Sequence, residues 1–143
     1  MRIFTVLLAV VLAACGISDP APTEALARLN LEREKWQRLS IRDYDFDVTY
    51  TNEWFPAKSV RIEVRGGSVA KVTEKSTGDA LESSGWPSVD SLFARAERNL
   101  REPERIVELR YDPIHHYPTL IDADTPNWAD DAERYDVGGL VRR

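Results

Sequence analysis

Residues 44–72 read YDFDVTYTNEWFPAKSVRIEVRGGSVAKV, and the alternation within this stretch decides the fold class. From Tyr44 to Tyr50, aromatic or aliphatic residues alternate with Asp and Thr. A period of two predicts a β-strand with one buried face and one face in water. Residues 60–65 alternate between aliphatic and charged side chains in the same way, and two glycines follow them. The stretch therefore predicts antiparallel strands joined by short turns.

Two registers are open for the hairpin that the glycines close. A two-residue turn would place Ile62 opposite Lys71, whereas a three-residue loop would place Ile62 opposite Ala70. Only the longer loop keeps apolar side chains opposite apolar side chains along both strands. We therefore expect a type I turn in which Gly67 takes the left-handed bulge position.

Helices are predicted before and after these strands. Residues 23–39 carry apolar side chains at helical spacing, with Arg33 inside the apolar stripe. Two interpretations of Arg33 remain: its stem covers the core while its head reaches water, or it pairs with a carboxylate of the sheet. Residues 88–101 give the clearest helix, because Ser88 suits the N-cap and Phe93 lies on a continuous apolar face.

The remaining sequence completes the sheet. Its expected elements are a loop at residues 77–87, strands at 107–111 and 117–123, an acidic loop at 124–133 and a short strand at 134–141. Gly138 and Gly139 weaken the last strand, which favours a place at the sheet edge. We expect an α+β domain in the order α-β-β-β-α-β-β: an antiparallel sheet of five or six strands, the sixth a terminal edge strand, with two helices on one face.

The first residues are typical of a bacterial lipoprotein signal. Arg2 precedes an apolar run at residues 3–14, which is too short to span a bilayer because a spanning helix needs about 20 apolar residues. The run ends in Leu-Ala-Ala before Cys15, a lipobox pattern. We expect residues 1–14 to be removed as a signal peptide and Cys15 to carry lipid. Residues 15–22 would then be a lipidated tether, and residues 23–143 one domain.

The residue after the cysteine bears on the destination of the lipoprotein. Gly16 stands where Asp would signal retention in the inner membrane, so the outer membrane, facing the periplasm, is favoured. Composition argues against nucleic acid as a partner. The formal net charge is −5, and nucleic-acid binding needs basic patches. Cys15 is the only cysteine, so lipidation would leave neither a disulfide nor a free thiol.

Trp54, Phe55 and Pro56 are the most unusual feature of the chain, because they lie at the tip of the first predicted hairpin. Exposed aromatic side chains on a loop suggest contact with a partner or a membrane. The alternative is that the rings fold back over the end of the sheet. We take Trp54 and Phe55 as candidate partner contacts.

Two weaker patterns suggest metal binding. The carboxylates at positions one, three, nine and twelve of a calcium-loop pattern are Asp122, Asp124, Asp130 and Glu133. Pro126 and Asn127 stand where that pattern needs a ligand and a glycine, so a solvated acidic loop is the stronger interpretation. Adjacent His115 and His116 lack a third strong ligand and are expected on a turn surface. We expect no cofactor and no resident metal.

A family resemblance rests on motifs spread along the chain. They are, in order, Trp36, the alternating strand 44–50, Leu92-Phe93, YDPIHHYP at 111–118 and Asp130-Asp131. This pattern resembles a bacterial domain family of unknown function that occurs in exported proteins and lipoproteins. The resemblance covers about residues 26–140 and implies fold and export but no activity.

The chain departs from the pattern of that family at three places. Residues 53–56 replace its paired cysteines, so a redox role is not expected for this hairpin. His115 and His116 stand where Tyr-Gly is usual, and Ala132 replaces the Glu of an Asp-Asp-Glu motif.

We therefore expect a non-catalytic lipoprotein of the cell envelope that presents a sheet face or the aromatic hairpin to a periplasmic or outer-membrane protein. The alternative is a calcium- or other metal-binding lipoprotein that uses the acidic loop. An enzyme ranks third, because neither a nucleophile elbow nor a glycine-rich phosphate loop is present.

Overall fold

A computed structural model describes residues 21–128 and 130–143. Cys15, the lipobox and the residues of the expected signal peptide lie outside the described residues. The described elements are α1 (Ala21–Arg38), β1 (Tyr44–Asn52), β2 (Lys58–Arg65), β3 (Ser68–Glu74), β4 (Ala80–Leu81), α2 (Val89–Arg101), β5 (Ile106–Tyr111), β6 (Pro118–Asp124) and β7 (Glu133–Arg142). None of the described helices is long and apolar enough to span a bilayer.

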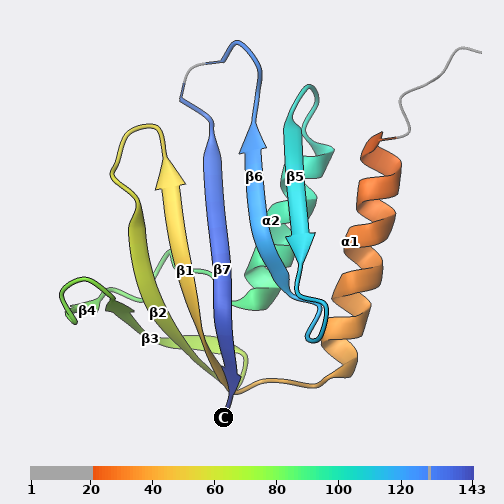
Figure 1. The fold of residues 1–143 in the computed structure, drawn as a ribbon. Helices are drawn as coiled ribbons and strands as arrows, with labels where there is room; N and C mark the ends of the chain where they lie inside the picture. The colour runs from red at the N-terminus through yellow and green to blue at the C-terminus, as the bar shows by residue number, and fades with distance from the viewer. Residues whose placement is uncertain (1–20, 129) are drawn as a thin grey trace, which may run out of the picture.

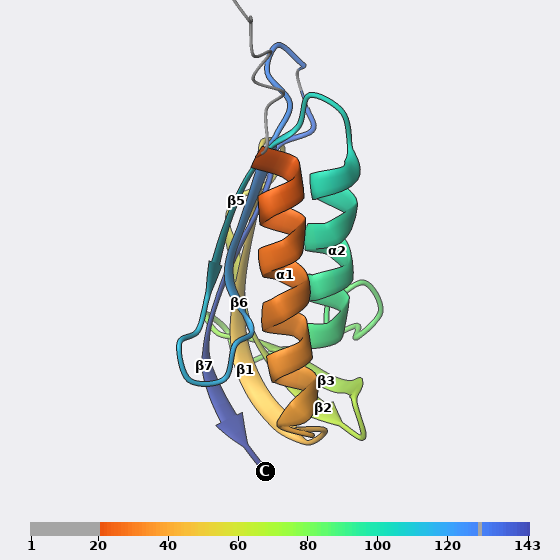
Figure 2. The same cartoon turned by 90° about the vertical axis from the view of Figure 1, so that its right-hand side faces the viewer.

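The strands form one antiparallel sheet in the order β4-β3-β2-β1-β7-β6-β5. Figure 1 shows the sheet face-on, and Figure 2 shows both helices packed against the same face. The expected α+β class, with an antiparallel sheet and two helices on one face, is confirmed.

The expected number and order of strands were wrong in two respects. β4 lies within the stretch that was expected to be a loop, where Leu81 pairs with Val72 at the sheet edge. β7 is a central strand between β1 and β6, not a terminal edge strand. The two glycines in β7 do not exclude it from the centre, because Val137 and Tyr135 fill the buried face of the strand.

One core fills the space between the helices and the sheet. Phe93 of α2 is 1% exposed, and Trp36 of α1 packs edge-on against the Tyr44 ring at a centroid distance of 5.5 Å. The Tyr44 hydroxyl accepts the backbone N–H of Val89 at 3.0 Å, so β1 also holds the first residue of α2. Ser88 caps this helix as predicted, because its hydroxyl accepts the backbone N–H of Ser91.

Arg33 is partly buried between the two helices. Its guanidinium lies 5.8 Å from the centroid of the Phe93 ring and donates to a Glu97 carboxylate oxygen at 2.7 Å. Pairing with a carboxylate is therefore the correct alternative, but the carboxylate belongs to α2 and not to the sheet. Arg33 joins α1 to α2.

The turn between β2 and β3 corrects the predicted register. Gly66 and Gly67 have φ of +60° and +85°, which is the pattern of a two-residue type I′ turn. A bulge follows this turn, and beyond it Ile62 pairs with Val72. The expected three-residue loop was wrong because the bulge restores apolar pairing after the shorter turn, which matches the twist of the strands.

This turn gives a prediction for stability. Gly66→Ala and Gly67→Ala should each lower the free energy of unfolding by about 1–2 kcal/mol, because a Cβ is penalised at positive φ. Gly138→Ala is the matched control, since Gly138 has no positive φ and no atom lies within 4 Å of an added Cβ. Urea unfolding of the three variants measures the difference. Equal stability of all three would contradict the type I′ turn.

Candidate functional site

An aromatic groove opens beside the β1–β2 hairpin. It has a volume of about 470 Å³ and is the "hairpin groove" below. Its lining consists of Tyr50, Asn52, Phe55, Pro56, Ala57, Lys58, Glu74 and Trp86. The hairpin supplies one wall, and Trp86, from the segment that precedes α2, supplies the other. Concave, mainly apolar sites with a few polar groups are the usual form of binding sites.

The wall of the groove is held in place by a side chain at the end of β1. One carboxamide oxygen of Asn52 accepts the backbone N–H groups of Trp54 and Phe55, at 3.1 and 2.9 Å. The Asn52 amide nitrogen also donates to the Tyr50 hydroxyl at 3.3 Å. An Asn that binds the backbone two and three residues ahead fixes a tight turn. The hairpin tip is therefore organised before any partner arrives.

A second hollow of about 260 Å³ continues the hairpin groove along the helix-facing side of the sheet, and the two share Tyr50 and Trp86. Tyr135 of β7 lies beside Tyr50 at a centroid distance of 4.8 Å. The Arg95 guanidinium lies 5.2 Å from the centroid of the Tyr135 ring and pairs with Glu133 at 2.7 Å. The floor is thus a row of rings with one fixed cation.

The electrostatics of this floor favour a neutral hydroxyl. Burial raises the pKa of Tyr135 to about 12, since the attraction of Arg95 is countered by Glu133 and Tyr50. The phenol therefore stays protonated at neutral pH and can donate a hydrogen bond. Lys58 and Glu74 are the two charged residues in the lining of the hairpin groove. This composition suits the binding of an apolar or aromatic segment.

The structure separates the two aromatic residues singled out in the sequence. Trp54 and Phe55 are 64% and 71% exposed, so neither ring folds back into the core. Phe55 lines the hairpin groove, whereas Trp54 lies outside its lining. Tyr50 and Trp86 were not predicted as site residues, because their sequence positions are those of a strand and a loop. Only the folded chain brings them together.

Of the four carboxylates of the calcium-loop pattern, two pair with basic side chains. Asp122 pairs with Arg134 at 2.8 Å, and Glu133 pairs with Arg95. Asp124 is exposed, and Asp130 donates its backbone N–H to Glu53 at 3.0 Å. Across residues 21–128 and 130–143, no group of three or more His, Cys, Asp or Glu side chains is arranged to hold a metal ion.

A buried carboxylate that the sequence analysis missed connects α1 to the β5–β6 turn. Glu32 is 2% exposed and accepts hydrogen bonds from Lys35 at 3.2 Å and from the His116 ring at 2.8 Å. Arg28 pairs with it at 3.0 Å. Its position in the sequence carried a signal, because Glu32 lies at helical spacing between two buried residues, Leu29 and Trp36.

This contact explains much of the YDPIHHYP motif. Asp112 accepts the backbone N–H groups of Ile114 and His115, at 3.0 and 2.6 Å, and so forms the turn. His116 has a φ of +66°, a conformation that favours glycine. The backbone strain that a histidine has at this position is offset by the hydrogen bond between its ring and Glu32. The motif therefore forms the β5–β6 turn and joins it to α1.

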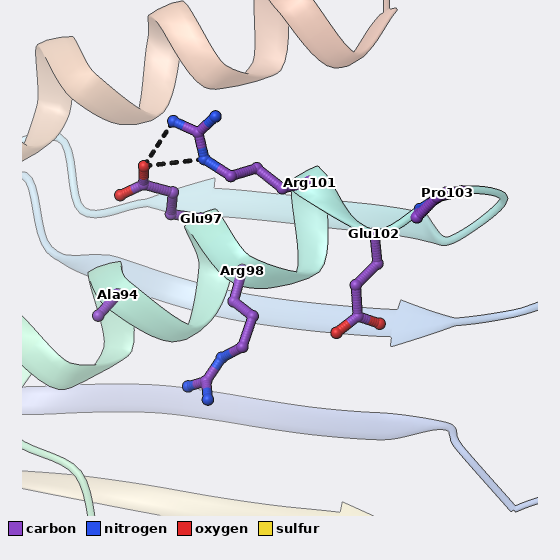
Figure 3. Close-up of a pocket in the computed structure, with 6 residues that line it drawn as sticks. All are labelled: Ala94, Glu97, Arg98, Arg101, Glu102 and Pro103. Carbon is purple, nitrogen blue, oxygen red and sulfur yellow. Dashed lines mark hydrogen bonds and ion pairs between the residues drawn. The ribbon is translucent and has the colours of Figure 1, made fainter.

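A further depression of about 430 Å³ lies on the exposed side of α2 (Figure 3). Figure 3 shows Arg101 reaching back to the Glu97 carboxylate, which also accepts from Arg33. Arg98 and Glu102 point away from this pair. The charged groups do not converge on a common point, so the hairpin groove is the better candidate site.

The fold is a small α+β domain: an antiparallel sheet covered on one face by two helices, with an aromatic groove beside one hairpin. The family of unknown function DUF6174 matches residues 28–141, and the chain belongs to this family. The matched range contains β1 to β6, α2, most of α1 and all of β7 except its last residue. The expected membership in a family of unknown function is confirmed. No curated protein sequence matches the chain.

The buried contact between Glu32 and His116 gives a prediction for pH dependence. Burial alone would raise the pKa of Glu32, but hydrogen bonds from Lys35 and His116 and the charges of Arg28 and Lys35 hold it below its ordinary value. A lowered pKa in the folded state stabilises the protein above pH 4.5, and this stability is lost as pH falls further.

Glu32→Gln should therefore reduce the free energy of unfolding at pH 7 by about 1–3 kcal/mol, since charge-assisted hydrogen bonds are lost. The difference from the unmodified chain should shrink as pH falls below 4.5, because the carboxylate is protonated first in the unfolded chain and then, at its lowered pKa, in the folded chain. Urea unfolding between pH 7 and pH 3 measures it. A difference that stays constant across this range would rule out the charged form of Glu32 as the source.

Proposed function

We propose that this protein is a lipid-anchored domain of the bacterial cell envelope that binds a partner protein through the hairpin groove. Cys15 carries the anchor in this proposal, and the outer membrane facing the periplasm is its location. The role is non-catalytic: the domain holds an apolar segment of its partner. The observation that carries the proposal is the exposed Phe55 ring, on a backbone held by Asn52, in the wall of an aromatic groove.

Three features support binding. The hairpin tip is fixed by Asn52, so little ordering is needed when a partner docks. Tyr50, Phe55 and Trp86 offer ring faces, and aromatic side chains dominate the affinity of many interfaces. Aromatic-lined grooves commonly receive extended, proline-containing segments, whose backbone is already stiff before binding. We assign such a segment of an envelope protein as the occupant.

The test replaces Phe55 by alanine in the full chain. A photo-crosslinking residue at Ala57, which also lines the groove, records partner contact in cells. Phe55→Ala should lower the affinity for the crosslinked partner about thirtyfold, the change expected for a loss of about 2 kcal/mol. The thermal midpoint should hardly change, because the ring is 71% exposed.

Ile114→Ala is the matched control, since Ile114 is also 71% exposed but lies in the β5–β6 turn. It should leave both crosslinking and stability unchanged. The proposal is wrong if Phe55→Ala and Ile114→Ala give the same crosslinking yield. Cys15→Ser tests the anchor separately, because a chain without the acceptor thiol should leave the membrane fraction.

A further inference from the structure

The exposed aromatic side chains gather at one end of the domain. Among the described residues, the exposed aromatic rings are Trp54, Phe55 and Trp128, at 64%, 71% and 70%. They lie in the β1–β2 and β6–β7 loops, and Figure 1 shows both loops at the end of the sheet where α1 begins. Ile106, 65% exposed, starts β5 at the same end. This set of residues is the "tether end" below.

Hydrogen bonds join the loops of the tether end into one surface. Glu53 of the β1–β2 loop accepts the backbone N–H of Asp130 in the β6–β7 loop at 3.0 Å. Arg105, which precedes β5, pairs with the Asp131 carboxylate at 2.9 Å and donates to its backbone oxygen at 2.8 Å. Asp131 also accepts the N–H of Thr125. The loops therefore present their aromatic rings from a connected frame.

The short distance along the chain from the proposed lipid site to α1 determines which surface the tether end can contact. Cys15, the proposed lipid site, precedes Ala21 by six residues, which span about 20 Å when fully extended. α1 begins at Ala21, at the same end of the sheet as the aromatic loops (Figure 1). The nine residues of β1 separate the two ends of the sheet by about 30 Å. With the lipid inserted, the tether end is the one closest to the bilayer.

We infer that the tether end rests on the lipid surface, with the Trp54 and Trp128 rings in the headgroup region. This inference rests on the proposed anchor at Cys15. Tryptophan is suited to this layer because its ring is apolar while its N–H needs a polar partner. A single acyl chain binds membranes only marginally, and a second contact stabilises attachment. The two tryptophans also fix the orientation of the domain.

The charge of the tether end selects the kind of lipid. Its exposed carboxylates, Glu53, Glu102, Glu104, Asp124 and Asp130, outnumber the exposed cations beside them, Lys58 and Arg101. Carboxylates near an anionic surface are repelled, and the repulsion is screened beyond about 10 Å at 0.1 M salt. The tether end therefore fits headgroups without net charge, such as phosphatidylethanolamine or phosphatidylcholine, and not a surface rich in phosphatidylglycerol.

Tryptophan fluorescence in vesicles tests the inference on the full lipidated chain. The vesicles contain phosphatidylcholine brominated near the headgroup, because bromine quenches a ring that touches it. Two of the four tryptophans, Trp54 and Trp128, should be quenched, which removes up to about half of the emission. Trp36 is buried and should keep its emission. Replacing the unlabelled lipid by phosphatidylglycerol, at a constant fraction of brominated lipid, should reduce quenching at low salt, and added salt should restore it.

Variants locate the quenched rings. Trp54→Ala with Trp128→Ala should abolish quenching while the chain still floats with the vesicles. Adding Ile114→Trp to that double variant places a ring at the far end of the sheet, and its emission should not be quenched. Quenching that persists in the double variant, or that appears with Ile114→Trp, would overturn the inference.

The same experiment separates the inference from the proposed anchor. A chain that floats with the vesicles but shows no quenching of Trp54 and Trp128 retains its anchor and overturns the membrane contact. A chain that does not float at all overturns the anchor, and the membrane contact with it. Quenching that rises with phosphatidylglycerol would overturn the assignment of a neutral lipid surface.

Discussion

The pairing of β7 with β1 is the contact on which the rest of the structure depends. β7 is antiparallel to β1 from Tyr44↔Arg142 to Asn52↔Glu133, and on its other side it pairs with β6. It therefore joins the first three strands to the β5–β6 hairpin, which would otherwise share no backbone hydrogen bonds with them. The same pairing sets Tyr50 beside Tyr135 in the floor of the groove and brings the two aromatic loops to one end.

Local patterns were enough to predict most elements, and they failed where the answer depended on distant residues. Both helices, the Ser88 cap and the alternating strands follow from spacing within a short window. The central place of β7 does not, because its two glycines suggest an edge and only pairing with β1 reveals the centre. The β2–β3 register failed because the sequence does not show the bulge that follows the turn.

The candidate site shows the same division. The sequence placed Trp54 and Phe55 at a hairpin tip but left open whether their rings are exposed or folded over the sheet, and the structure shows that they are exposed. The groove was not predictable, since Trp86 reaches the hairpin only through the fold. Buried Glu32 and the strained His116 together show that the YDPIHHYP motif stabilises the fold. We therefore propose that function lies with two exposed surfaces: the hairpin groove for a partner segment and the tether end for the lipid surface.

Amide hydrogen exchange across β7 tests the central place of this strand most directly. Residues 133–136 pair with β1 on one side and with β6 on the other, so every amide there has a backbone acceptor. The account predicts slow exchange at all four consecutive amides, close to the rate set by global unfolding. An edge strand would instead show slow and fast amides in alternation. Alternating protection through residues 133–136 would contradict the account.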